Sequence, residues 1–251
     1  MLGVFDRVFL RISSDLRKTR PPFKLTVFLR KVKLKIMTKP TDIRILDVHY
    51  DFEEHQYRTP LKFGGVPTDH CILFNVRVQV QTRDGKEAEG KGSMPLGNVW
   101  AFPPRYAPFD QSLAAMKKLA DLAVAATQDC TLCAHPLELS EVLEPEFLKI
   151  ADDLSHNIQL ASPMPKLCTV VTTSPIDAAI HDAFGKANGI NSYDGLGEDF
   201  IQADLSHFLN KRFTGKYLDR YTSRHHQTHP THHPNTPVSY THLTLPTNRE
   251  V

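Results

Sequence analysis

The sequence predicts an α+β fold in which a three-stranded antiparallel meander is followed by a helical bundle, with disordered ends. Two observations predict this fold class. Between Cys71 and Thr82, apolar and polar residues alternate with the period of two that is typical of a half-buried strand. After Pro108, apolar residues instead recur at steps of three and four, the period of an amphipathic helix. All strands precede all helices, unlike the strict alternation of a parallel barrel.

The three strands are expected in the first half of the chain. The first begins near Ile43, and the second follows at Cys71. The apolar residues of the second strand are Ile72, Phe74, Val76, Val78 and Val80. The dipeptide Asp84-Gly85 then supplies the residues with positive backbone φ that a tight hairpin turn requires. Residues 87–93 are therefore expected to return as the third strand.

Two helices are expected after the sheet. The first follows Pro108, and its apolar stripe consists of Leu113, Met116, Leu119, Ala120, Ala123 and Val124. The second runs from about Leu139 to Leu154. Because proline removes a helical hydrogen bond, Pro145 is expected either to divide this helix or to mark its first turn. Together these helices would cover one face of the sheet.

A third helix has the clearest limits. Ser174 is a candidate N-cap, Pro175 fits the first helical position, and Gly189 is placed to end the helix. The apolar stripe consists of Ile176, Ala179, Ile180, Ala183, Phe184 and Ala187. His181 and Asp182 lie on the same helix, but adjacent helical residues point about 100° apart. We therefore do not expect these two side chains to form an acid–base dyad.

Composition and charge limit the classes of partner. The chain has 251 residues, of which 41% are hydrophobic and 23% charged, as in a globular protein. Residues 1–36 hold ten lysines and arginines against Asp6 and Asp15, a net charge of +8, which leaves about −6 for the remainder. Since only this first segment is basic, we expect no nucleic-acid partner. No apolar run reaches the roughly 20 residues that span a membrane, so we expect no membrane partner.

Cysteine and histidine spacing points away from metal chemistry. Four cysteines are too few for a disulfide scaffold, which favours a reducing, cytoplasmic location. Cys130 and Cys133 form one C-x-x-C without a second pair, and two buried small apolar residues explain it better than a metal or redox site. His49, His55 and His70 lack the spacing of metal ligands. We therefore expect no metal site in this chain.

Both ends are expected to lie outside the fold. Residues 1–40 form a basic leader, better explained as translated upstream sequence than as an import signal or a membrane contact. Residues 222–251 begin with a His-rich tract at 224–237 that cannot bury a core and would bind metals only adventitiously. From Val238 on, the sequence resembles a translated reading frame of a transposase-based sequencing adapter. The domain itself is expected over residues 41–221.

Three stretches of the middle segment resemble parts of one known domain. Tyr-Arg-Thr-Pro-Leu-Lys-Phe-Gly-Gly at 57–65 lies between the first two strands, and Gly-Lys-Gly-Ser-Met-Pro-Leu-Gly-Asn-Val-Trp-Ala-Phe-Pro at 90–103 leaves the third. The helix at 174–189 ends in Gly-Lys-Ala-Asn-Gly. In this order, the stretches resemble the N-terminal capping domain of the mandelate racemase and muconate lactonizing enzyme branch of the enolase superfamily.

The resemblance implies a parent enzyme with a second part. In that family a (β/α)₇β barrel holds Mg²⁺ at acidic strand ends, and Lys or His bases remove the proton α to a carboxylate. None of this barrel is visible in the sequence, since a barrel needs about 200 residues. We therefore expect a truncated fragment that is inactive alone, with no catalytic residue and no cofactor of its own. Mg²⁺ is expected in the full-length parent, a racemase, epimerase or dehydratase.

The first two stretches resemble the substrate-specificity loops of that family. The residues that the resemblance selects are Arg58, Lys62, Phe63, Gly64, Asn98 and Trp100. Arg58 and Lys62 either pair with a substrate carboxylate or phosphate, or are solvated loop charges. Phe63 and Trp100 are candidates for the pocket wall, although Trp100 also fits a core anchor beside Phe102.

The parent is expected to bring its own partners. These are the missing barrel, a small carboxylate substrate and further copies of the chain, because we expect a homo-oligomer. The alternative is a non-catalytic interaction module, in which the exposed helical surface meant for the barrel binds another protein chain. A third interpretation, a His-rich metal-binding protein, depends on residues 225–233 alone.

Overall fold

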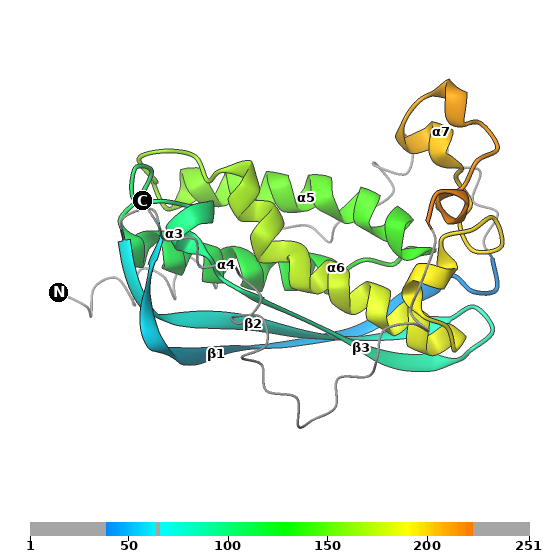
Figure 1. Ribbon diagram of the computed structural model, residues 1–251, viewed down its shortest axis with the longest axis horizontal. Helices are drawn as coiled ribbons and strands as arrows, with labels where there is room; N and C mark the ends of the chain where they lie inside the picture. Colours follow the sequence, from blue (N-terminus) through cyan, green and yellow to red (C-terminus); the bar gives the residue numbers. More distant parts are fainter. Residues whose placement is uncertain (1–38, 64–65, 223–251) are drawn as a thin grey trace, which may run out of the picture.

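The computed structural model describes residues 39–63 and 66–222, and these form a sheet covered on one face by helices (Figure 1). The strands are β1 (Ile43–Phe63), β2 (Val66–Thr82), β3 (Glu87–Pro95) and β4 (Cys133–Ala134), in the antiparallel order β3-β2-β1-β4. The main helices are α4 (Phe109–Gln128), α5 (Pro136–Asn157) and α6 (Lys166–Asn188). The predicted α+β class is confirmed, and the two-residue β4 extends the expected meander.

Several sequence expectations fall on parts of the chain that are not described. The basic leader lies there as far as residue 38, as do the His-rich tract and the adapter-like end. Gly64 also lies outside the described residues.

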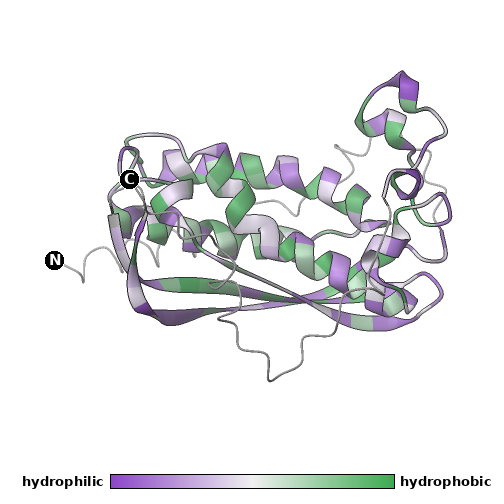
Figure 2. Cartoon of the chain, viewed as in Figure 1, coloured by the Kyte–Doolittle hydropathy of each residue, from purple (hydrophilic) through white to green (hydrophobic). Residues whose placement is uncertain are grey.

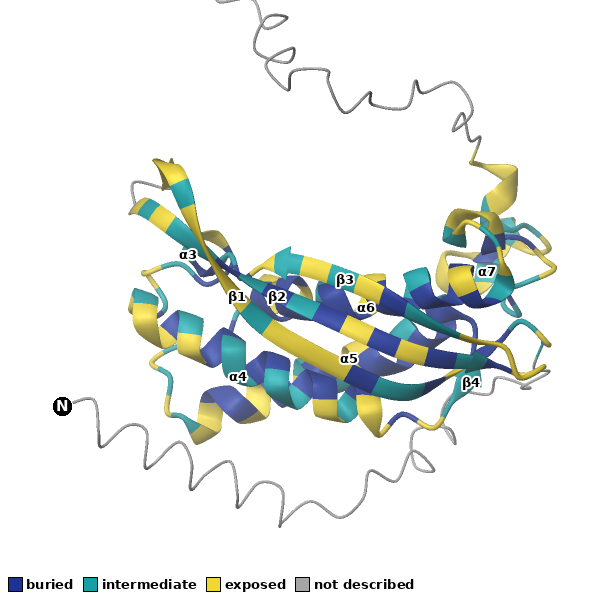
Figure 3. Ribbon diagram, turned by 90° about the horizontal axis from the view of Figure 1, so that it is seen from below, coloured by how far each residue is buried: buried dark blue, intermediate teal, exposed yellow. Residues whose placement is uncertain are grey.

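The alternation in β2 has the expected consequence. Phe74, Val76, Val78 and Val80 are at most 1% exposed and face the helices, whereas the polar residues between them lie on the open face of the sheet (Figure 3). The core therefore lies between the sheet and the helices, as the apolar colouring of both layers indicates (Figure 2). The hairpin to β3 turns at Gly85, which has a φ of 90°. Asp84 does not share the positive φ that we expected of it.

β1 is longer than the sequence suggested. Residues 57–65 were expected to form a loop, but β1 continues to Phe63 and pairs with the start of β2. The register shifts between Gln56 and Leu61 and then resumes, with Leu61 opposite Thr68. Backbone pairing thus overrides the loop character of a polar stretch that contains Pro60. The two strands form a long hairpin whose far end extends beyond the helices (Figure 3).

α5 starts earlier than expected and is not divided. His135 caps it: its ring Nδ1 accepts the N–H of Leu137, and the Glu138 carboxylate accepts the N–H of His135. This reciprocal arrangement is a capping box. The helix then runs through Pro145 to Asn157, so this proline neither divides the helix nor marks its first turn.

α6 corrects a second expectation. It begins at Lys166, so Ser174 is not its N-cap and Pro175 is not in its first turn. Pro175 has no N–H to donate to the carbonyl oxygen of Val171, and the Ser174 hydroxyl donates to that oxygen instead, at 2.9 Å. The expected end is confirmed: Gly189 closes the helix in the left-handed region, with a φ of 68°.

β3 and α6 approach each other closely. A Cβ built on Gly90 would lie 2.1 Å from the carbonyl oxygen of Ala179, so only glycine fits there. The third strand was expected over residues 87–93, and β3 continues two residues further, to Pro95. A short helix, α3 (Asn98–Ala101), follows and leads into α4.

The segment after α6 folds back on α5. It contains the short helix α7 (Leu205–Phe208) and the 3₁₀ turns η1 (Ser192–Gly195), η2 (Lys211–Phe213) and η3 (Leu218–Arg220). The N–H of Gln202 donates to Glu138 at 3.2 Å, and the ring of His207 lies 2.8 Å from the Glu141 carboxylate. Ile201 is 2% exposed, so this segment adds to the buried core.

Candidate functional site

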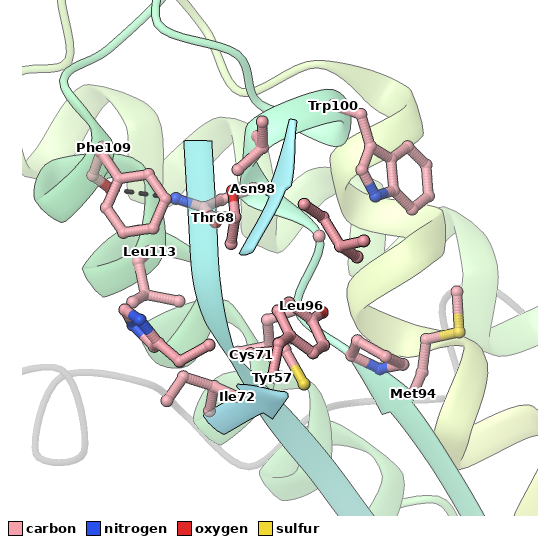
Figure 4. Close-up of a pocket in the computed structure, with 15 residues that line it drawn as sticks. Tyr57, Thr68, Cys71, Ile72, Met94, Leu96, Asn98, Trp100, Phe109 and Leu113 are labelled. Atoms are coloured by element: carbon pink, nitrogen blue, oxygen red, sulfur yellow. Dashed lines mark hydrogen bonds between the residues drawn. The ribbon is translucent and has the colours of Figure 1, made fainter. Parts of the chain in front are cut away.

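A pocket of about 250 Å³ lies under the far end of the β1–β2 hairpin. The hairpin, the end of β3, α3 and the start of α4 each contribute side chains to it (Figure 4). Its lining includes Tyr57, Leu61, Thr68, Met94, Trp100 and Leu113. Residues from four separate segments of the sequence therefore converge on one space.

Trp100 forms part of this lining and is 38% exposed. Its indole lies against Gly97, because a Cβ built on Gly97 would stand 2.1 Å from the indole Nε1. The neighbouring Phe102 is fully buried instead. Of the two positions that the sequence allowed for Trp100, pocket wall or core anchor, the structure shows the first. Phe102 lies in the core, and Trp100 lies beside the pocket.

Asn98 also lines the pocket, but its amide is engaged in the fold. Its Nδ2 donates to the carbonyl oxygen of Phe109 at 3.1 Å and to the Ser112 hydroxyl at 3.0 Å. Asn98 is 4% exposed. These bonds hold α3 against the first turn of α4, so Asn98 shapes the pocket by positioning Trp100.

The two cations selected from the sequence are not brought into this pocket. Arg58 and Lys62 are exposed on β1, and neither lines it. Phe63 ends β1, where its backbone pairs with Val66. The structure therefore brings together Asn98 and Trp100 and leaves the two cations outside.

The pocket lining also includes polar residues that sequence reasoning did not select, namely Tyr57, Thr68, His70 and Cys71. Thr68 has a buried Oγ1 with no hydrogen-bond partner among the described residues. A side-chain hydrogen bond with Cys71 raises the pKa of Tyr57 above its usual value. No local motif marks these residues, because their shared environment arises only when the hairpin packs over α3 and α4.

A buried histidine lies at the opposite end of the sheet. His135 is 1% exposed; its Nδ1 accepts the N–H of Leu137, and its Nε2–H donates to the carbonyl oxygen of Gly195 at 3.0 Å. Burial, with the nearby His181 as a second cause, lowers its pKa to about 3. The ring is therefore neutral and already bonded at both nitrogens, which suits a structural role rather than proton transfer.

His181 and Asp182 have different partners, as the helical geometry predicted. The Nε2 of His181 lies 3.9 Å from Asp177, one turn earlier on α6. Asp182 accepts the backbone N–H of Lys91 at 2.8 Å and pairs with Lys186 at 2.6 Å. Asp182 thus ties α6 to β3.

The described residues offer no site for a metal ion. Within residues 39–63 and 66–222, no group of three His, Cys, Asp or Glu side chains is placed to hold one. The residues of this part of the chain therefore do not fit a Mg²⁺ site. In the same part, no helix has both the length and the apolar character needed to cross a membrane.

Comparisons with known proteins give weak likenesses to solved structures. No family model matches the chain, and no curated protein matches it. An enolase from Bradyrhizobium complexed with magnesium and mandelic acid is similar with a TM-score of 0.34 and 16% identity over 61% of this chain and 34% of that one. L-talarate/galactarate dehydratase from Salmonella typhimurium LT2 is similar with a TM-score of 0.34 and 20% identity over 63% and 35%. The chain thus spans about a third of the length of these proteins.

Proposed function

We propose that this chain is the N-terminal capping domain of a Mg²⁺-dependent enzyme of the enolase superfamily, in the mandelate racemase and muconate lactonizing enzyme branch. One observation carries the proposal: an antiparallel meander is followed by three long helices, and the third of them, α6, ends in Gly-Lys-Ala-Asn-Gly with Gly189 as a left-handed cap. The sequence stretch at 174–189 resembles the last capping helix of that family. This assignment gives the pocket beside Trp100 a position facing the substrate.

In this proposal the chain shapes the active site but does not perform the chemistry. Mg²⁺ and the bases that remove the proton α to a carboxylate belong to a barrel elsewhere in the parent enzyme. Because the described residues do not fit a Mg²⁺ site, we place no step of the reaction in this chain. Its role is to close the barrel mouth and exclude water, which strengthens electrostatic interactions inside the site. The parent would be a racemase, epimerase or dehydratase.

A partner surface is available on α6. Leu167 is 52% exposed and Val170 is 42% exposed. Residues three apart lie on the same side of a helix, so these side chains form one apolar strip. In the proposed function the barrel or another copy of the parent covers this strip. In the alternative, a non-catalytic interaction module, a different protein chain covers it.

The test is exchange of the α-proton. The complete parent protein is incubated in D₂O with Mg²⁺ and a panel of 2-hydroxy carboxylates. This chain alone is treated in the same way, and deuterium incorporation is followed by NMR in both samples. The proposal predicts Mg²⁺-dependent incorporation by the complete protein and none by this chain. Incorporation by this chain alone, or none by a complete protein that includes a barrel, would contradict it.

A further inference from the structure

The open face of the sheet, which Figure 3 presents to the viewer, carries a second depression of about 340 Å³. This volume lies within the range of small-molecule sites. The side chains of its lining that carry charge or hydrogen-bonding groups come from β1, β2 and β3, and they are Asp51, Asn75, Arg77, Lys91 and Ser93. The strand register sets them in two neighbouring rows. Arg77 lies opposite Lys91 in one row, and Asn75 lies between Asp51 and Ser93 in the other.

The first row is basic. Arg77 and Lys91 are both exposed, and neither forms an ion pair within residues 39–63 and 66–222. His49 lies on the other side of Arg77, and its Nε2 is 3.0 Å from the Asp47 carboxylate, so that carboxylate already has a partner. Like charges directly opposite each other destabilise a sheet. An anionic group between Arg77 and Lys91 would remove this repulsion and accept charge-assisted hydrogen bonds from both side chains.

The second row is polar, with an acidic end. The Asn75 Nδ2 donates to the Asp51 carboxylate at 3.0 Å, and the Ser93 hydroxyl donates to the Asn75 Oδ1 at 2.6 Å. The Asn75 Nδ2 also lies 3.3 Å from the Glu53 carboxylate, so a second acid stands beside Asp51. These bonds hold the Asn75 amide in place between the two acids and Ser93. Because Asp51 is exposed, its carboxylate remains accessible to a cationic group.

From these two rows we propose that the depression binds a small zwitterion, with its anionic group between Arg77 and Lys91 and its ammonium group at Asp51. Rows two residues apart along an antiparallel strand are separated by about 7 Å. A molecule whose opposite charges lie roughly this far apart contacts both rows at once. A simple anion is repelled by Asp51, and a simple cation is repelled by Arg77 and Lys91. The charge pattern therefore selects for a ligand that carries both charges.

The test compares three linear molecules of similar length. The full chain, labelled with the heavy nitrogen isotope, is titrated with γ-aminobutyrate, butyrate and butylamine at constant ionic strength, and the amide signals of Arg77 and Ser93 are followed by NMR. The zwitterion should bind saturably with a dissociation constant of about 10 mM, and the two singly charged molecules should bind about threefold to fivefold more weakly. No saturable shift at these amides, or equal affinity for all three molecules, would overturn the proposal.

Matched variants test the basic row. Arg77→Gln and Lys91→Gln each remove one cation of the depression, whereas Arg58→Gln and Lys62→Gln make the same changes at exposed positions of β1 outside it. The first two variants should weaken γ-aminobutyrate binding by about threefold, and the other two should leave it unchanged. Far-UV circular dichroism checks that all four variants fold. Equal weakening in both groups, or in neither, would contradict the assigned contacts.

Asp51→Asn gives a signature that a merely structural change would not produce. Asparagine can still accept the hydrogen bond from the Asn75 Nδ2 but no longer attracts an ammonium group or repels a carboxylate. The variant should therefore bind γ-aminobutyrate more weakly than the wild type and bind butyrate more tightly. Weakening of both ligands together would show that Asp51 only supports the local structure.

This site is independent of the proposed function. If γ-aminobutyrate binds but the complete protein exchanges no α-proton, the proposed function fails and the zwitterion site stands. If the complete protein exchanges the proton but no zwitterion binds, the site proposal fails and the proposed function stands.

Discussion

Gly92 of β3 and Pro175 of α6 meet backbone to backbone, because a Cβ placed on Gly92 would lie 2.1 Å from the carbonyl oxygen of Pro175. Gly90, two residues earlier on the same face of β3, makes an equivalent contact with Ala179. Two missing side chains thus allow a helix to rest directly on a strand. Since no Cβ fits at these distances, the packing of α6 on the sheet depends on both glycines.

Gly92→Val is expected to destabilise the fold by about 3 kcal/mol or more, because the new side chain would push α6 away from β3. Chemical denaturation followed by circular dichroism measures the change. The matched control is Lys91→Ala, on the exposed face of the same strand, which should change stability by less than about 0.5 kcal/mol. Equal stability of Gly92→Val and the wild type would show that α6 does not pack as described.

Gly189 tests a purely conformational effect. Its φ is 68°, and no atom of residues 39–63 and 66–222 lies within 4 Å of a Cβ built there. Gly189→Ala should therefore cost about 1 kcal/mol, from the left-handed backbone alone. Urea unfolding measures this loss. A loss above about 3 kcal/mol would indicate a steric contact that the structure does not contain.

His135 is expected to make the free energy of unfolding decrease at acidic pH. Burial lowers its pKa to about 3, so below pH 6.5 the unfolded chain binds a proton that the folded chain does not. The stability is therefore complete above pH 6.5 and is lost as the pH falls from 6.5 toward 3. At pH 5 the loss from this group is roughly 2 kcal/mol. Unfolding free energies at pH 7.5 and pH 5 should differ less in His135→Gln than in the wild type, and an identical difference in both proteins would contradict the account.

Asp42 should act in the opposite direction. It is 1% exposed, and burial raises its pKa to about 6. Between pH 3.8 and pH 6 the folded chain therefore binds a proton at Asp42 that the unfolded chain does not. Burying the ionised carboxylate destabilises the fold, and protonation of Asp42 as the pH falls from 6 toward 4 removes this destabilisation. In Asp42→Asn this relief is absent, and the loss of stability on going from pH 7.5 to pH 5 should be larger than in the wild type. An equal loss in both proteins would show that the carboxyl is ionised at pH 5 in the folded chain.

Glu138 connects the capping box to the segment after α6. One carboxylate oxygen accepts the N–H of His135, and the other accepts the N–H of Gln202. Glu138→Ala should therefore cost about 2 kcal/mol and accelerate hydrogen exchange at the Gln202 amide. Glu144→Ala, at an exposed position of the same helix, should change neither quantity. Unchanged exchange at Gln202 in Glu138→Ala would show that this bond does not hold the segment.

Local patterns predicted the parts of the fold that depend on local physics. The alternation through Val76 and Val78 predicts a strand because only that conformation places the apolar residues on one face and the polar residues on the other. Gly189 was predictable as a helix end because it adopts the left-handed conformation that other residues avoid. The start of α6 was missed because Ser174 and Pro175 form a typical helix start. In the structure these residues lie inside the helix, where the Ser174 hydroxyl donates to the Val171 carbonyl oxygen in place of the N–H that Pro175 lacks. The sequence pattern alone does not reveal this hydrogen bond.

The candidate site was less predictable than the fold. Trp100 and Asn98 were selected from the sequence and do line the pocket. Thr68 was missed, because its buried hydroxyl, which has no partner in the described part of the chain, becomes distinctive only when the hairpin folds over α3 and α4. Arg58 attracted attention through its charge, yet the long β1 strand carries it away from the pocket.

The most direct test of the central claim, that this chain caps a catalytic barrel, is long-read sequencing of the source DNA across the codons for residues 219–238. The account predicts that the reading frame continues into alternating strands and helices with acidic residues at the strand ends. A confirmed His-rich tract followed by a genuine stop codon would contradict it and would leave the interaction module as the function to pursue.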